Sequence, residues 1–216
     1  MKQASIFIVD DHPLVRKGLT QLIDGEPDLT VSGEAASIDE TLKKLSNSTP
    51  DLAIIDLSLP DGNGLGLVKR LLARYPKLPI LISSMYDEMM FAKRALKLGA
   101  KGYINKSATG DEMIEAIRLV LKGEEYISHS LAEQLSYINT DSSQQRDLSP
   151  VEKLSDRELE VFESIGKGMG TGAIAADLSL SVKTIESHRA NIKTKLGLHS
   201  AGELMRRAIQ WSLDAR

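Results

Sequence analysis

The segment LAIIDLSLPDGNG, residues 52–64, decides the fold of this chain. Four apolar residues run directly into an acid, Asp56, and the chain then enters a turn marked by Pro60, Gly62 and Gly64. A short apolar run bounded by turn residues is typical of a buried strand. The segment therefore predicts a strand that presents a carboxylate at its carboxyl end.

The same pattern repeats through the first 124 residues. SIFIVD, DLTVSGEA, PILISS and GYIN predict four more short buried strands, at 5–10, 28–35, 79–84 and 102–105. Amphipathic segments separate them: one places Val15, Leu19 and Leu22 on a single helical face, and others span 38–46, 65–74, 87–98 and 109–122. Strands that alternate with helices favour an α/β fold, a parallel sheet covered on both faces. We predict a flavodoxin-like, doubly wound domain of five βα units over residues 1–124.

From residue 125 onward the pattern changes. Residues 139–150 are polar and serine-rich without periodicity, so we predict a linker over 125–150, with room for one short helix. Beyond it Ser155 and Glu158 have the spacing of a capping box, and Gly197 is a typical helix stop. The sequence predicts a small all-α domain of four helices over 151–216.

Composition excludes several classes of protein. The 216 residues contain no cysteine, which rules out disulfides, thiolate metal sites and a cysteine nucleophile. The sequence has no apolar run long enough to cross a bilayer and no signal peptide, so we expect a cytoplasmic protein that does not bind membranes. With a net charge of −3, any nucleic-acid surface must come from local clustering of basic residues.

Acidic residues occur at two of the predicted strand ends. Asp10 and Asp11 end the first strand as Asp56 ends the third. In a sheet of order 2-1-3-4-5 these two strands are neighbours, and their carboxyl ends meet at the topological switch point, where ligands bind. Converging carboxylates raise one another's pKa, and a hard cation such as Mg²⁺ offsets the repulsion. We predict a site for Mg²⁺ and a phosphoryl group.

Two later residues complete this predicted site. Ser84 ends the fourth strand and Lys106 follows the fifth, and both side chains can bind phosphate oxygens. Asp56 can then act as a nucleophile and form an aspartyl phosphate. Taken singly, each acid could be a helix cap or turn former and Lys106 a solvated charge. The joint occurrence of the right group at four strand ends favours the phosphoryl site.

Motifs in both halves resemble one family. VDDH, IIDLSLPDGNG, ISSMYD and GYINK resemble the receiver domain of two-component response regulators. LSDRELEVF and IAADLSLSVKTIESHRANIKTKLG resemble the LuxR-type helix-turn-helix. Together, and in this order, they resemble the NarL/FixJ class over nearly the whole chain.

The resemblance implies roles for residues of the first domain. Asp56 would be the phosphoacceptor and also a Mg²⁺ ligand, together with Asp10, Asp11 and the backbone carbonyl of Ser58. Ser84 would be the switch hydroxyl, Tyr103 the switch aromatic and Lys106 the phosphate-binding lysine. Ser83 is the alternative to Ser84, which fits the spacing better, and Tyr103 taken alone could be plain core. Ser107 departs from the pattern, because many receivers carry proline there.

In a helix-turn-helix the second helix enters the major groove of double-stranded DNA. Here that helix spans 182–196, with Ile185, Ile192 and Leu196 facing inward. The predicted DNA-binding residues are Lys183, Thr184, Glu186, Ser187, Arg189, Ala190, Asn191, Lys193 and Lys195. Glu186 has two interpretations, accepting a hydrogen bond from a cytosine amino group or pairing with a neighbouring basic side chain.

These features predict a phosphorylation-switched, DNA-binding transcriptional regulator. A sensor histidine kinase would phosphorylate Asp56, and the altered receiver would promote homodimerisation or release the second domain. We expect no enzymatic activity beyond the receiver's own phosphorylation and dephosphorylation. One alternative is a regulator that works without phosphate. Another is an aspartate-nucleophile phosphohydrolase, which would need a second acid at Ser58.

The closing helix carries a stripe of Leu204, Ala208 and Trp211. This stripe has two interpretations, a dimer surface or packing within the four-helix domain. The sequence does not choose between them.

Overall fold

The computed structural model describes residues 3–46, 49–86, 88–128, 131–132, 150–178 and 180–214. The chain divides into two compact units, Met1–Ser136 and Tyr137–Arg216. Most of the expected linker, 125–150, and most of the short helix expected in it lie outside the described residues. The residue limits of the two domains therefore stay a prediction.

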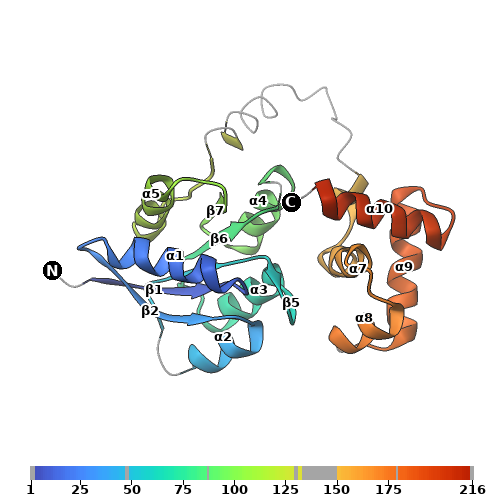
Figure 1. Cartoon of the computed structure of the whole chain (residues 1–216), viewed down its shortest axis with the longest axis horizontal. Helices are drawn as coiled ribbons and strands as arrows, with labels where there is room; N and C mark the ends of the chain where they lie inside the picture. The colour runs from blue at the N-terminus through green and yellow to red at the C-terminus, as the bar shows by residue number, and fades with distance from the viewer. Residues whose placement is uncertain are drawn as a thin grey trace. The chain divides into compact units, whose positions relative to one another are not determined.

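The first unit alternates strands and helices around one sheet (Figure 1). Its elements are β1 (Ala4–Val9), α1 (Pro13–Asp24), β2 (Leu29–Ala35), α2 (Ile38–Lys44), β3 (Leu52–Ile55), β4 (Ser58–Leu59), β5 (Gly62–Asn63), α3 (Gly64–Arg74), β6 (Ile80–Ser84), α4 (Glu88–Leu98), β7 (Gly102–Asn105) and α5 (Gly110–Leu121). The five longer strands are parallel in the order β2-β1-β3-β6-β7. This is the expected 2-1-3-4-5 order, and the predicted α/β fold is confirmed.

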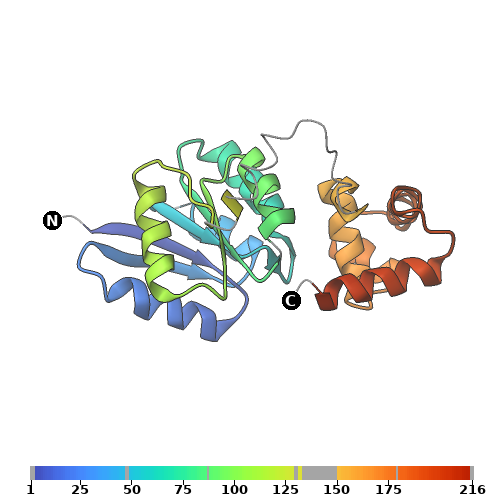
Figure 2. The same cartoon turned by 90° about the horizontal axis from the view of Figure 1, so that it is seen from above.

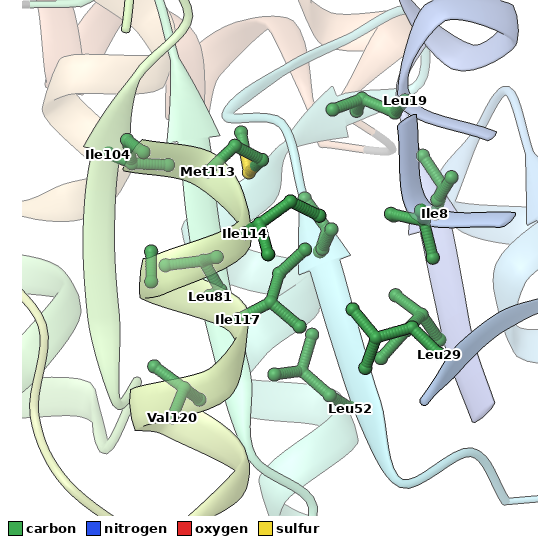
Figure 3. Close-up of a cluster of buried hydrophobic side chains, with 14 residues drawn as sticks. Ile8, Leu19, Leu29, Leu52, Leu81, Ile104, Met113, Ile114, Ile117 and Val120 are labelled. Carbon is green, nitrogen blue, oxygen red and sulfur yellow. The ribbon is translucent and has the colours of Figure 1, made fainter. Parts of the chain in front are cut away.

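Helices cover both faces of this sheet. Helices α1 and α5 share one face, where their apolar residues join the sheet in one buried cluster, and α2, α3 and α4 pack in succession on the other (Figure 2). Within the cluster Ile114 and Ile117 extend from α5 toward Leu52 of β3 (Figure 3). Each such side chain contributes roughly 1.5–3 kcal/mol of hydrophobic free energy when fully buried. This core holds the carboxyl ends of the strands at one edge.

A miniature hairpin follows β3, where the sequence indicated only a turn. Strands β4 and β5 pair antiparallel, with Ser58 opposite Asn63. Gly62 has φ +148°, and a Cβ on Gly64 would lie 2.2 Å from the Asp56 carbonyl oxygen. The Asn63 side chain then caps α3 by accepting a hydrogen bond from Leu65 N at 2.8 Å. The hairpin thus brings the chain back against the end of β3.

The described part of the second unit, 150–178 and 180–214, is all helical, as predicted. It contains a 3-10 turn (Pro150–Lys153) and helices α7 (Asp156–Gly166), α8 (Thr171–Asp177), α9 (Val182–Leu196) and α10 (Ala201–Asp214). The Ser155–Glu158 capping box is confirmed, and Gly197 ends α9 in the left-handed conformation at φ 66°. Helix α8 has Gly170 as its N-cap and Thr171 as its first helical residue, so no side chain caps this helix.

The α10 stripe packs inside its own domain. Leu204 and Ala208 are fully buried, and the Trp211 ring lies 5.6 Å from that of Phe162 in α7. A Cβ on Gly166 would approach the Ala208 carbonyl oxygen to 2.7 Å, so the two helix backbones are close. Of the two interpretations of this stripe, intradomain packing is therefore correct.

Among the described residues, every helix is too short or too polar to span a bilayer.

Candidate functional site

A buried lysine joins the ends of two neighbouring strands. The backbone N–H of Asp56 donates to the carbonyl of Val9 at 2.8 Å, so β1 and β3 end side by side. Asp10 and Asp56 are each only 2% exposed. Lys106 Nζ, from the loop after β7, lies 2.6 Å from Asp10 Oδ2 and 2.6 Å from Asp56 Oδ2. Three of the predicted site residues thus form one charged cluster.

Four potential metal ligands gather at this cluster. Donor atoms of Asp10, Asp11, His12 and Asp56 all lie within 4.8 Å of one another. A set rich in carboxylate oxygens fits a hard divalent cation, so this pocket can hold Mg²⁺. His12 was not predicted, although it directly follows the acid pair: its backbone N–H donates to Asp10 Oδ1 at 2.8 Å, and its Nδ1 lies 2.7 Å from Asp11 Oδ1.

The cluster balances burial against charge. Burial raises the pKa of Asp56, Lys106 acts in the opposite sense, and the nearby Asp10 carboxylate adds to the rise. Burial favours a lower pKa for Lys106, but the Asp56 and Asp10 carboxylates outweigh it, and the pKa of the lysine is raised. Lys106 therefore remains charged at neutral pH and partly neutralises two buried acids. A divalent cation would complete that neutralisation.

The two predicted switch residues meet at the backbone of Tyr86. Ser84 Oγ accepts a hydrogen bond from Tyr86 N at 3.2 Å. The Tyr103 hydroxyl donates to Tyr86 O at 2.9 Å, and Tyr103 is fully buried. The Tyr86 ring stacks on Phe91 of α4, with ring centroids 4.8 Å apart. Ser83 is also buried, and the choice of Ser84 stays a prediction.

Ser58 and Ser107 flank the site. The Ser58 N–H donates a hydrogen bond to Asp56 Oδ1 at 3.2 Å. The role of the Ser58 carbonyl as a metal ligand stays a prediction. Ser107 N and Oγ both donate to Asn105 Oδ1, at 2.9 and 2.7 Å. The departure from proline at Ser107 is therefore compatible with the position of Lys106 in the cluster.

The segment after α5 runs along the edge strand β7. Tyr103 N donates to Tyr126 O at 2.9 Å, and Tyr126 N donates to Lys101 O at 2.9 Å. Ser128 donates from both N and Oγ to the Glu88 carboxylate at the start of α4. The sequence predicted a linker here, with room for one short helix. In the structure, Tyr126 and Ser128 instead hydrogen-bond to residues of the first unit, and they form part of that unit.

Helix α9 presents most of the predicted DNA-binding residues to solvent. Lys183, Glu186, Ser187, Ala190 and Asn191 are exposed, and Thr184, Arg189 and Lys193 are half-buried. Lys195 differs, because its Nζ lies 2.6 Å from Glu158 Oε2 of the α7 capping box. This lysine has an intradomain partner that the sequence did not predict.

Comparisons with known proteins fit this architecture. Residues 6–118 match the response regulator receiver domain, and residues 152–208 match the luxR family of bacterial regulatory proteins. The chain belongs to the NarL/FixJ class of response regulators. This response regulator is 39% identical over 214 residues to the oxygen regulatory protein NreC of Staphylococcus aureus strain JH9, covering 96% of this chain and 98% of NreC.

Solved structures of similar shape include the RcsB response regulator of Salmonella typhimurium, at 25% identity and a TM-score of 0.77 over 98% of this chain and 99% of that one. RcsB bound to promoter P1flhDC in the presence of the phosphomimetic BeF₃⁻ matches at 25% identity and a TM-score of 0.74, over 97% of this chain and 100% of that one. This response regulator is therefore a DNA-binding transcriptional regulator.

Proposed function

We propose that phosphorylation of Asp56 switches DNA binding by this transcriptional regulator. The observation that carries the proposal is the bridge of Lys106 between Asp10 and Asp56, two acids only 2% exposed. A buried group of two acids and one lysine costs desolvation energy that a purely structural role rarely repays. Its position at the switch point of the sheet is where α/β proteins bind ligands.

Each residue of the cluster has a part in phosphoryl transfer. An oxygen of Asp56 attacks the phosphorus of a phosphohistidine, a P–O bond forms, and the P–N bond to the histidine breaks. Asp10, Asp11 and Asp56, with the Ser58 carbonyl, would hold Mg²⁺, which when bound neutralises charge on the phosphoryl oxygens. Lys106, already 2.6 Å from Asp56, is within reach of the same oxygens. The donor is a sensor histidine kinase or a small phosphodonor.

The conformational response runs through Ser84 and Tyr103. Both are hydrogen-bonded to the backbone of Tyr86, so a shift of the Ser84 hydroxyl toward the new phosphoryl group moves the acceptor of the Tyr103 hydroxyl. This biases a two-state equilibrium that involves α4, β7 and α5. The outcome is homodimerisation or release of the DNA-binding domain, whose α9 reads the major groove.

The outer face of α10 supports a homodimer. Met205, Ile209 and Leu213 follow at intervals of four residues and are 42%, 40% and 66% exposed. Residues four apart share a helix face. This outer stripe, Met205, Ile209 and Leu213, is distinct from the buried stripe that packs on α7. We propose it as the surface that pairs two DNA-binding domains.

Phosphorylation with acetyl phosphate and Mg²⁺ tests the switch. Intact-mass measurement should show the gain of one phosphoryl group in the wild type and in Asp39→Asn, an exposed acid used as matched control. Asp56→Asn should show no gain, and its DNA affinity should not respond to the donor. DNA binding that is equal in all three proteins, with and without donor, would favour the regulator that works without phosphate. Continuous phosphate release would favour the hydrolase.

A further inference from the structure

We propose that Arg16 is a positioning residue for the acid pair, acting through the backbone carbonyl of Asp10. This inference rests on the proposed function of the site. Arg16, in α1, is half-buried, and its Nη1 donates a hydrogen bond to Asp10 O. Its Nε lies 3.2 Å from Glu34 Oε2 of β2. One guanidinium thus connects the loop after β1 to the neighbouring strand.

The hydrogen bond from Arg16 completes the fixation of Asp10. The Asp10 N–H donates to the Ala35 carbonyl at 3.0 Å, and its side chain accepts from His12 N at 2.8 Å and contacts Lys106 at 2.6 Å. The Asp10 carbonyl begins the peptide unit that leads into Asp11. A donor on that carbonyl therefore sets the orientation of the peptide between the two acids.

Glu34 and Thr20 in turn orient the guanidinium. Thr20 Oγ1 donates to Glu34 Oε1 at 2.8 Å, one turn along α1 from Arg16. The Glu34 carboxylate thus accepts from Thr20 on one oxygen and from Arg16 on the other. Glu34 also neutralises the positive charge of Arg16, which would otherwise repel a metal ion bound nearby. A lysine could not replace Arg16, because an ammonium lacks the planar fork that donates in two fixed directions.

Arg16 contacts the backbone carbonyl of Asp10, not the carboxylate oxygens that would hold the metal or the reacting oxygen of Asp56. Its loss should therefore weaken cation affinity and leave the chemistry at Asp56 intact when cation is in excess. Partners that orient metal ligands typically change affinity by about 10-fold or more when removed.

Binding of Mn²⁺ to the full chain, followed by electron paramagnetic resonance of the free ion, tests this role without measuring activity. Arg16→Gln should bind Mn²⁺ roughly 10-fold more weakly than the wild type. Arg16→Lys should not restore affinity, whereas Arg70→Gln, an exposed arginine of α3, should bind like the wild type. Labelling by acetyl phosphate should need proportionally more Mg²⁺ in Arg16→Gln and reach the same plateau.

Unchanged Mn²⁺ affinity in Arg16→Gln overturns the inference, and so does a lowered plateau at excess Mg²⁺, which would mark a role beyond cation binding. If Arg16→Gln unfolds, Thr20→Val replaces it in the test, because this variant keeps every charge. We expect Thr20→Val to bind Mn²⁺ roughly threefold more weakly than the wild type. Mn²⁺ affinity equal to that of the wild type would overturn the inference. A wild type that neither binds Mn²⁺ nor accepts phosphate would instead refute the proposed function.

Discussion

At position 64 the lack of a side chain lets the loop after Asp56 close. A Cβ there would lie 2.2 Å from the Asp56 carbonyl oxygen and 2.8 Å from Leu57 Cα. Both atoms belong to the backbone, so no side-chain rotation can relieve the clash. Any residue larger than glycine must displace the backbone that carries Asp56.

Gly64→Ala should therefore lower the free energy of unfolding of the receiver by about 2 kcal/mol or more, because the backbone clash forces strain into the loop. Gly18→Ala is the matched control, since nothing lies within 4 Å of its Cβ position in α1. That control should be stabilised by roughly 0.5–1 kcal/mol. Urea unfolding followed by far-ultraviolet circular dichroism measures both, and equal shifts in the two variants would contradict the account.

The acids of the site were predictable from the sequence, whereas two supporting residues were not. Asp10, Asp11 and Asp56 stand at strand ends, and the parallel topology then brings them together. Tyr86 takes part through its backbone N–H and carbonyl, which every residue type carries. Arg16 lies on a polar helix face, where a basic residue is ordinarily solvated. Their partners became visible only with the three-dimensional arrangement.

Among whole elements, periodicity predicted the long ones and missed the short ones. Helix α9 has the expected bounds, Val182–Leu196, because an apolar face, an N-cap and a stop glycine all agree. The two-residue strands β4 and β5 have no periodicity to detect. Sequence spacing also does not show that Glu158, which belongs to the capping box of α7, forms an ion pair with Lys195 of α9. That pair links α7 to the proposed recognition helix.

The Glu158–Lys195 pair should make the second domain sensitive to acid. Burial tends to raise the pKa of Glu158, but hydrogen bonds from Lys195 and from Ser155 outweigh it and hold the pKa below its ordinary value. The stabilisation of the folded domain by the Glu158–Lys195 pair is therefore complete above the pKa of Glu158 in the unfolded chain, roughly 4.3. It is lost as pH falls through the lower pKa of Glu158 in the folded domain. Glu158→Gln should be less stable than the wild type at pH 7.

The difference in stability between Glu158→Gln and the wild type should shrink as pH falls below about 4. Urea unfolding monitored by the fluorescence of Trp211 reports on this domain, since that ring packs on Phe162 of α7. Glu186→Gln, an exposed acid on α9, is the control and should keep wild-type stability. A gap between Glu158→Gln and the wild type that is constant from pH 7 to pH 3 would count against the pair.

At the scale of the whole molecule, α10 carries two apolar stripes, one buried and one exposed. The buried stripe packs on α7 inside the domain, whereas the outer stripe remains exposed in the described chain. Helix-turn-helix dimers bind half-sites about one turn of DNA apart, so pairing of two domains is a natural use for such a stripe. A receiver that promotes pairing would then convert phosphorylation into tighter binding at double sites.

Ile209→Glu tests this use, because a charge in the middle of the outer stripe should prevent pairing without disturbing the buried stripe. Sedimentation velocity should show phosphorylated wild type as a dimer and phosphorylated Ile209→Glu as a monomer. Ala176→Glu, a substitution of an exposed alanine of α8, is the control and should still dimerise.

Affinity for DNA with two half-sites should fall on the order of 100-fold in Ile209→Glu, because the second contact is no longer intramolecular. Affinity for a single half-site should stay the same, since α9 is untouched. A dimer that survives Ile209→Glu would move the interface away from α10.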